Sequence, residues 1–224
     1  MTHIQATGFY MVPVRDLFTA IKYGLLYNWY AATDARNICA AGAHVPTSDE
    51  FVTLSAYLGG SDVAGQKLKE ADPTYWTVNT GTNEAKFNAR GAGFRTDTGT
   101  FSGAKLFNNL STITSYPPVN NRMFVLRGDA DNFANSFCHR RYGLSIRPLK
   151  DSTDLEDGEE GIYMGNDGKI YRTICIGTQE WLADNLCETK YRNGDSIPEV
   201  TDAGDWAALT TGALCAYEND WDNV

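Results

Sequence analysis

The feature that most constrains this chain is an acidic run about two thirds of the way along it. Residues 151–160 hold six acids, no base and a single apolar side chain, Leu155. Such a run repels itself and has nothing to bury, so we expect a solvated connector there. It separates about 150 residues from a C-terminal piece of about 64, which is marginal in size for an independent domain.

The overall charge and hydropathy limit the kinds of partner. The chain carries a formal net charge of −9 at pH 7, whereas binding to a phosphate backbone needs a basic face, so we expect no nucleic-acid partner. Its longest uncharged apolar stretch, residues 23–33, is about half of the ~20 residues that a membrane helix needs, so we expect no membrane partner. The first residues show no basic region followed by an apolar core, so no secretory signal is expected.

Five cysteines bear on redox state and on zinc binding. Their number is odd and no two form a Cys-x-x-Cys pair, which argues against a zinc ribbon and against a fully paired disulfide framework. We expect free or partly paired thiols. One pair among Cys175, Cys187 and Cys215 stays open, because these three share the last fifty residues.

The sequence predicts few helices. The best one follows Pro46, where Thr47 and Glu50 have the spacing of a capping box, an apolar stripe follows, and Gly59-Gly60 provide a stop. A second helix is expected over residues 61–70.

Strands and loops account for most of the remaining chain. Residues 169–176 form the clearest strand, because their apolar side chains alternate between two faces. Residues 77–121 are rich in Gly, Thr, Asn and Ser, so we expect loop with short strands there. The expected class is therefore α+β, with few short helices, short antiparallel strands and long ordered loops.

The C-terminal piece should be integral to the fold. Because about 64 residues cannot bury large aromatic side chains alone, we predict that Trp181, Trp206 and the strand 169–176 pack against Tyr27 and Trp29.

Catalytic and metal-binding motifs are weak, so no enzyme and no cofactor is expected. Gly65-Gln66-Lys67 resembles a phosphate loop only loosely, and a glycine-broken helix start is the alternative. The three histidines are scattered, and His44 is interpreted as a core histidine with a satisfied hydrogen bond. The acidic runs lack the register of a helix-loop-helix calcium site, while a single structural calcium at the surface stays open.

The segment 120–147 differs in character from the rest of this acidic chain. It carries five arginines against two aspartates, interleaved with aromatic residues and asparagines. Such side chains supply contact area, planar hydrogen bonding and adaptability, as binding surfaces do. We predict a ligand-binding surface, gathered on one exposed face, made of Arg122, Asp129, Asp131, Asn132, Phe133, Asn135, Phe137, His139, Arg140 and Tyr142. The alternative is that the aromatic residues belong to the core and the arginines are merely solvated.

Several motifs resemble one known family. Before the acidic run these are Tyr27-Asn28-Trp29-Tyr30-Ala31, His44-Val45-Pro46, Tyr57-Leu58-Gly59-Gly60 and Gly143-Leu144-Ser145-Ile146-Arg147. After it come Asn166-Asp167-Gly168-Lys169-Ile170-Tyr171, Ile176-Gly177-Thr178-Gln179-Glu180-Trp181 and Asn185-Leu186. In these motifs the sequence resembles the Fibrobacter succinogenes major paralogous domain.

The family's opening motifs come last here, so the resemblance implies a circular permutation or a cut across a tandem array. Residues 1–22 would then be an N-terminal attachment segment and residues 23–150 the main part of one domain. Residues 151–160 would connect it to residues 161–224, which would complete the same domain or that of a neighbouring subunit. Permutation at an exposed loop is physically cheap, because chain ends tend to lie close together.

The resemblance also implies a fold and a role. It implies a C-type-lectin-like fold, shared with formylglycine-generating enzymes, in which the stretch before the last strand is the binding face. We therefore expect a non-enzymatic binding module on a virion surface, or else on a bacterial cell surface or secreted. It would recognise a bacterial surface glycan or protein, contact other virion subunits and form a homo-oligomer. A purely structural or decoration protein of a virion or cell surface is the alternative, and a glycan-active enzyme is a less favoured one.

Overall fold

The computed structural model describes residues 18–224. Within that range the α-helices are α1 (Trp29–Ala32), α2 (Ser48–Tyr57), α3 (Ser61–Leu68) and α4 (Ala203–Ala207), and short 3-10 turns are η2 (Pro73–Tyr75), η3 (Tyr217–Asn219) and η4 (Trp221–Asn223). The strands are β1 (Leu26–Tyr27), β2 (Ala43–His44), β3 (Ala92–Arg95), β4 (Phe101–Ala104), β5 (Phe107–Tyr116), β6 (Asn120–Arg127), β7 (Phe133–His139), β8 (Leu149–Lys150), β9 (Glu160–Met164), β10 (Ile170–Ile176), β11 (Gln179–Leu182) and β12 (Leu214–Cys215).

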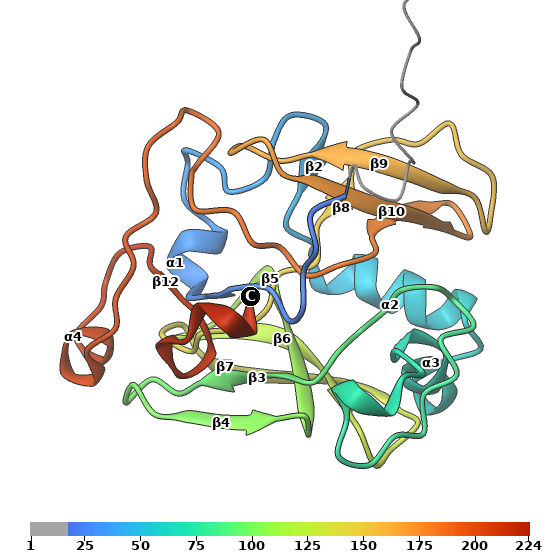
Figure 1. Ribbon diagram of the computed structural model, residues 1–224, viewed down its shortest axis with the longest axis horizontal. Helices are drawn as coiled ribbons and strands as arrows, with labels where there is room; N and C mark the ends of the chain where they lie inside the picture. Colours follow the sequence, from blue (N-terminus) through green and yellow to red (C-terminus); the bar gives the residue numbers. More distant parts are fainter. Residues whose placement is uncertain (1–17) are drawn as a thin grey trace, which may run out of the picture.

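The strands of this range form two five-stranded sheets and a small two-stranded ladder. One sheet has the order β2-β8-β11-β10-β9, the other has the order β4-β3-β5-β6-β7, and β1 pairs with β12. Figure 1 shows β9 and β10 in an upper layer, β3 to β7 in a lower layer, and α2 and α3 at one side. Almost all the pairing is antiparallel, which confirms the predicted α+β class.

The helix after Pro46 is confirmed in position and capping. Thr47 caps α2 by accepting the Glu50 backbone N–H, and the Glu50 carboxylate accepts the Thr47 backbone N–H at 2.7 Å. The next helix, α3, ends two residues before the predicted stop at Glu70. Its capping residue Lys69 is extended, and the buried ammonium donates to Thr80 Oγ1 and to the carbonyl oxygens of Arg127 and Ala130. The helix α3 therefore ends at the residue before Lys69, whose ammonium group binds the carbonyl oxygens of the turn after β6.

The prediction for residues 77–121 is wrong over β5. β3 and β4 are short, as expected, but β5 runs for 10 residues and pairs with β6 over most of its length. Four of its interior residues are polar and buried: Asn108, Asn109, Ser111 and Thr112. Polar residues at buried positions remove the alternation of apolar side chains by which a strand is found in a sequence.

Trp181 and Trp206 are buried, as predicted, but in core clusters that include neither Tyr27 nor Trp29. Trp206 of α4 shares its cluster with Leu26 and Cys215. Trp181 of β11 stacks on Phe51 of α2, with ring centroids 5.0 Å apart, rather than on Tyr27 or Trp29. The reason is the place of β11, which lies beside β8 in the sheet that faces α2. Tyr171 of β10 does share a core cluster with Tyr27, so that part is confirmed.

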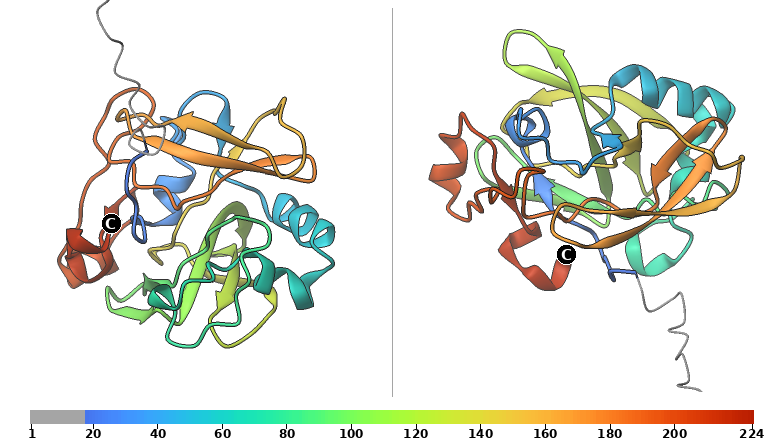
Figure 2. Two further views of the ribbon diagram at one scale, coloured as in Figure 1. Left: turned by 45° about the vertical axis from the view of Figure 1, so that its right-hand side comes forward. Right: turned by 90° about the horizontal axis from the view of Figure 1, so that it is seen from above.

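The segments before and after the acidic run meet in the core. The buried guanidinium group of Arg147 donates to Asn185 Oδ1 from Nη2 at 2.8 Å and from Nε at 3.2 Å. At the surface, the Lys22 backbone N–H donates to the carbonyl oxygen of Val224 at 3.0 Å, and Figure 2 shows the C-terminus beside the blue segment that enters the fold. Residues 161–224 thus pack on this chain's own core, while the domain boundaries stay a prediction and residues 1–17 of the expected attachment segment lie outside the described residues.

The acidic run is exposed at most positions, but it is not a free linker. Asp157 accepts hydrogen bonds from the Tyr57 hydroxyl group at 2.6 Å and from the Gly177 backbone N–H at 2.7 Å. Its last residue, Glu160, begins β9. The five cysteines all lie in the described range and are buried free thiols, so the pair left open in residues 175–215 is not formed.

Candidate functional site

The strands β6 and β7 carry half of the predicted binding residues, and the hairpin that they form has two ends far apart. The pairing runs from Leu126↔Phe133 at the turn to Asn120↔His139 at the opposite end. Six residue steps at about 3.3 Å each put roughly 20 Å between these ends. The predicted single cluster on one exposed face is therefore wrong.

At the turn, the structure gives the predicted residues local structural roles. Asp129 forms an ion pair with Arg127 at 2.9 Å, so the Arg127-Gly128-Asp129 tripeptide closes on itself. The backbone at Asp131 and Asn132 lies against α3, where a Cβ on Gly65 would meet the Asn132 carbonyl oxygen at 2.2 Å. The glycine of the loose phosphate-loop motif thus permits close packing of a helix on a turn.

Phe133 is a correction. Its side chain is 1% exposed and packs between Phe51 and Phe124, with ring centroids 5.5 and 4.8 Å away. The expectation that it lies on an exposed face is wrong, because α2 and α3 cover this end of the sheet.

At the opposite end the strands leave the cover of the helices, and aromatic and arginine side chains gather there. We call this the distal end and define it as Tyr116, Val119, Arg122, Phe137 and Arg140. Phe137 is 50% exposed, as predicted, and lies against Tyr116, which is itself 36% exposed, with ring centroids 4.9 Å apart. Arg122 lies opposite Phe137 on β6, and its guanidinium carbon is 4.3 Å from the centre of the Tyr116 ring.

The two arginines of the distal end have no carboxylate partner within residues 18–224. The Arg122 guanidinium group makes no hydrogen bond within residues 18–224 and stacks on the Tyr116 ring. Arg140 lies over the Trp29 ring at 4.4 Å and donates to Ser115 Oγ at 2.7 Å. Stacking on an aromatic face holds a guanidinium group in place while its hydrogen-bonding edge stays available.

The remaining predicted residues are spread around the distal end. Asn135 is exposed between the buried and exposed phenylalanines of β7. His139 accepts the Arg141 backbone N–H, and partial burial together with Arg141 lowers its pKa. Tyr142 is a correction, because its ring stacks on Phe94 at 6.0 Å in a satellite cluster with Met123 and Cys138.

A pocket of about 510 Å³ borders the distal end between α1 and β5. Its walls include Trp29, Val45 and Ile113, and Ser115 forms its boundary with the distal end. His44 stands in this wall and is not a core histidine, because its side chain is 31% exposed. Both ring nitrogens are satisfied, by Asp151 at 2.6 Å and by Glu50 at 2.9 Å, so that half of the prediction is confirmed.

Sequence reasoning missed Tyr116 and Val119 as members of the distal end and Trp29 as a wall of the pocket beside it. Tyr116 and Val119 flank the two prolines of a hairpin turn, which is a signal for an exposed aromatic residue next to a tight turn. Trp29 is predicted above to pack against the C-terminal piece, whereas the structure leaves it half-buried with Arg140 over its ring.

The described residues offer little for metal or membrane chemistry. In residues 18–224, no three or more His, Cys, Asp or Glu side chains are grouped to hold a metal ion. No helix of that range is long and apolar enough to cross a bilayer. The distal end therefore offers aromatic area and guanidinium groups, which are means of recognition.

Fold and surface together define a class: a small α+β domain of short strands that presents aromatic and arginine side chains at the open end of one sheet. The chain belongs to the Fibrobacter succinogenes major domain family, whose model matches residues 6–150. No curated protein and no solved structure matches the chain.

Proposed function

We propose that this protein is a non-enzymatic binding module that recognises a bacterial surface glycan or protein through the distal end. Its support is the state of Arg122, whose guanidinium group lies on Tyr116 beside Phe137 and has no partner in the described chain. Arginine and aromatic side chains at such positions supply most of the binding energy of recognition surfaces.

Local charge adds to this support. The chain as a whole has a net charge of −9, yet Arg122 and Arg140 stand at the distal end without an ion pair within residues 18–224. Most acidic side chains of the chain lie elsewhere, notably in residues 151–160. A partner with negative charge near apolar groups would complement this end.

The wider setting is also a proposal. We infer a C-type-lectin-like fold in permuted order on a virion surface, with other virion subunits and further copies of the chain as neighbours. Two contacts are compatible with permutation. The contact of Lys22 with Val224 brings together the two chain ends that would be continuous in an unpermuted family domain. The contact of Arg147 with Asn185 joins the segments before and after the acidic run. A decoration protein without a ligand is the competing function.

The test compares matched variants in a binding assay on intact bacterial cells and on a glycan array. Phe137→Ala and Arg122→Ala should each weaken binding by about 30-fold or more, which corresponds to the ~2 kcal/mol of a typical hot-spot side chain. Their melting temperatures should stay close to the wild-type value, because neither side chain is buried in the core.

Two controls lie on the same strands. Arg127→Ala removes an exposed arginine from the turn end of β6, and it should bind as the wild type does. Phe133→Ala removes the buried phenylalanine of β7 and should cost about 3 kcal/mol of stability or more. If Phe137→Ala and Arg122→Ala both bind as tightly as the wild type, the proposal is contradicted. If the wild type binds no cell and no glycan, the decoration role is favoured.

A further inference from the structure

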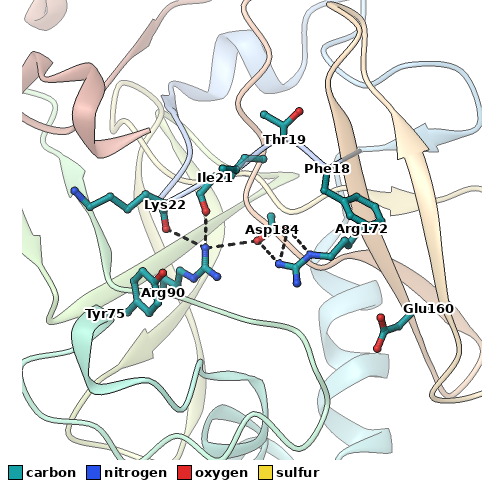
Figure 3. Close-up of a pocket in the computed structure, with 10 residues that line it drawn as sticks. Phe18, Thr19, Ile21, Lys22, Tyr75, Arg90, Glu160, Arg172 and Asp184 are labelled. Atoms are coloured by element: carbon teal, nitrogen blue, oxygen red, sulfur yellow. Dashed lines mark hydrogen bonds and ion pairs between the residues drawn. The ribbon is translucent and has the colours of Figure 1, made fainter. Parts of the chain in front are cut away.

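A second pocket, of about 660 Å³, lies where the entering chain meets the sheet of β9 and β10. Its lining consists of residues 18–22, Tyr75, Arg90, Glu160, Arg172 and Asp184, and Figure 3 shows Tyr75 and Arg90 on one side and Phe18, Arg172 and Glu160 on the other. Its volume falls in the range of small-molecule sites. It shares no lining residue with the distal end or with the pocket beside it.

The floor of this pocket is a pair of arginines held by one buried carboxylate. Asp184, whose side chain is 6% exposed, accepts a fork of hydrogen bonds from Arg172, at 3.0 Å from Nη2 and 3.3 Å from Nε. The same carboxylate lies 3.6 Å from Arg90 Nη1. Figure 3 shows the two guanidinium groups on either side of Asp184.

The Arg90 guanidinium group is also held by residues other than Asp184. Its Nη1 donates to the Ile21 carbonyl oxygen at 2.5 Å, and its guanidinium carbon lies 4.3 Å from the centre of the Tyr75 ring. Glu70 lies 3.5 Å from its Nη2. Both guanidinium groups are thus positioned before any ligand arrives, which lowers the entropic cost of binding.

One exposed donor of this pair is left over, whereas Arg90 Nε is buried and also lacks a hydrogen-bond partner in the described chain. Arg172 uses Nε and Nη2 on Asp184, while its Nη1 has no partner within residues 18–224, and the side chain is 40% exposed. Lys86 lines a smaller pocket that Arg172 also lines, and Lys22 lines the larger pocket on the side of Arg90, with its ammonium group donating to the Asp222 carbonyl oxygen. The charged side chains of the two pockets with Glu70 sum to four cations and three acids, in a chain whose net charge is −9.

The rest of the lining suits the body of a sugar. Glu160, which pairs with Lys86 at 2.8 Å, offers carboxylate oxygens to hydroxyl groups. Phe18, Ile21 and the edge of Tyr75 supply apolar area for the C–H face of a ring. The free Nη1 edge of Arg172 can donate charge-assisted hydrogen bonds to a carboxylate, and these are stronger than hydrogen bonds to the neutral hydroxyl groups of a sugar.

We propose that this pocket binds a saccharide unit bearing a carboxylate, such as a uronic acid, with the carboxylate on the free Nη1 edge of Arg172 and the ring hydroxyl groups toward Glu160. The site is independent of the distal end, and it adds a small acidic ligand to whatever partner that end recognises.

The experiment is a titration of the full chain, followed by NMR chemical shifts or calorimetry, with three probes. Glucuronate should bind saturably with a millimolar Kd. Glucose, which has the ring without the carboxylate, and acetate, which has the carboxylate without the ring, should each bind at least ten-fold more weakly. Arg172→Gln should weaken glucuronate binding at least ten-fold, and Arg172→Lys should lose part of it because an ammonium group lacks the planar fork.

The control is Arg36→Gln, because Arg36 is also 40% exposed and also paired with aspartates, Asp34 and Asp195, but lies outside this pocket. It should bind glucuronate as the wild type does, and melting curves verify that each variant is folded. No saturable binding of glucuronate, equal binding of glucose, or wild-type affinity in Arg172→Gln would each overturn the proposal. A loss in Arg36→Gln as large as that in Arg172→Gln would overturn it as well.

Discussion

A buried acid in the C-terminal piece makes the stability of this protein depend on pH near neutrality. Glu188 has no exposed surface, and its carboxylate accepts hydrogen bonds from the Tyr171 hydroxyl group at 2.6 Å and from the Asp167 backbone N–H at 2.8 Å. The fit is close, because a Cβ on Gly165 would lie 2.0 Å from its Oε1. Burial raises the pKa of Glu188 from 4.5 to about 7, against the two hydrogen bonds, which lower it.

The sign of the effect follows from linkage. The folded protein holds this proton more tightly than the unfolded chain does, so the resulting stabilisation is complete below about pH 4.5 and is lost as the pH rises through about 7. Each pH unit between the two pKa values is worth about 1.4 kcal/mol. Between pH 5 and pH 8 the loss from this one group is about 2.5 kcal/mol.

Glu188→Gln should remove that loss, because an amide does not ionise. Its oxygen can still accept the Asp167 N–H, and its NH₂ group can donate to the Tyr171 oxygen. Relative to the wild type, the free energy of unfolding of the variant should therefore rise by about 2.5 kcal/mol between pH 5 and pH 8. Urea denaturation followed by tryptophan fluorescence at each pH measures it.

The exposed Glu84 supplies the control, since Glu84→Gln should leave the pH profile of stability as it is in the wild type. The reasoning would be refuted if the difference in the free energy of unfolding between the wild type and Glu188→Gln stayed constant from pH 5 to pH 8.

Two further predictions concern contacts described above. Asn185→Ala strips two hydrogen bonds from the buried Arg147 guanidinium group and should cost about 3 kcal/mol of stability or more in urea, whereas Asn193→Ala at an exposed position should cost less than about 0.5 kcal/mol. Burial alone would lower the pKa of His44, but its hydrogen bonds to Asp151 and Glu50 raise it, so its stabilising charge is present below about pH 6.5 and is lost above that. His44→Gln should lower the melting temperature more at pH 5.5 than at pH 8.5, by an amount worth less than about 1 kcal/mol because the pair is partly exposed, and an equal change at both pH values would contradict it.

Local signals in the sequence were sufficient where local interactions decide the structure. The capping box at Thr47 and Glu50 marks the start of α2, and the alternation in residues 169–176 marks β10, because both depend on neighbours within a few residues. The strand β5 could not be found in this way, since Asn108 and Asn109 are buried by segments distant in the sequence.

The binding residues show the same limit more sharply. Phe133 and Phe137 lie four residues apart on one face of β7, yet one is 1% and the other 50% exposed. Only the reach of α2 and α3 across the sheet separates them, and no pattern within β7 encodes that reach. Composition could therefore indicate a recognition segment, but not which of its ends faces solvent.

The contact between Lys22 and Val224 has a mechanical consequence. Anything joined to Val224 leaves the folded body at the point where the chain before Lys22 arrives. When such a domain is pulled through both attachments, the load falls first on the few contacts at that junction, which open one after another as in a zipper.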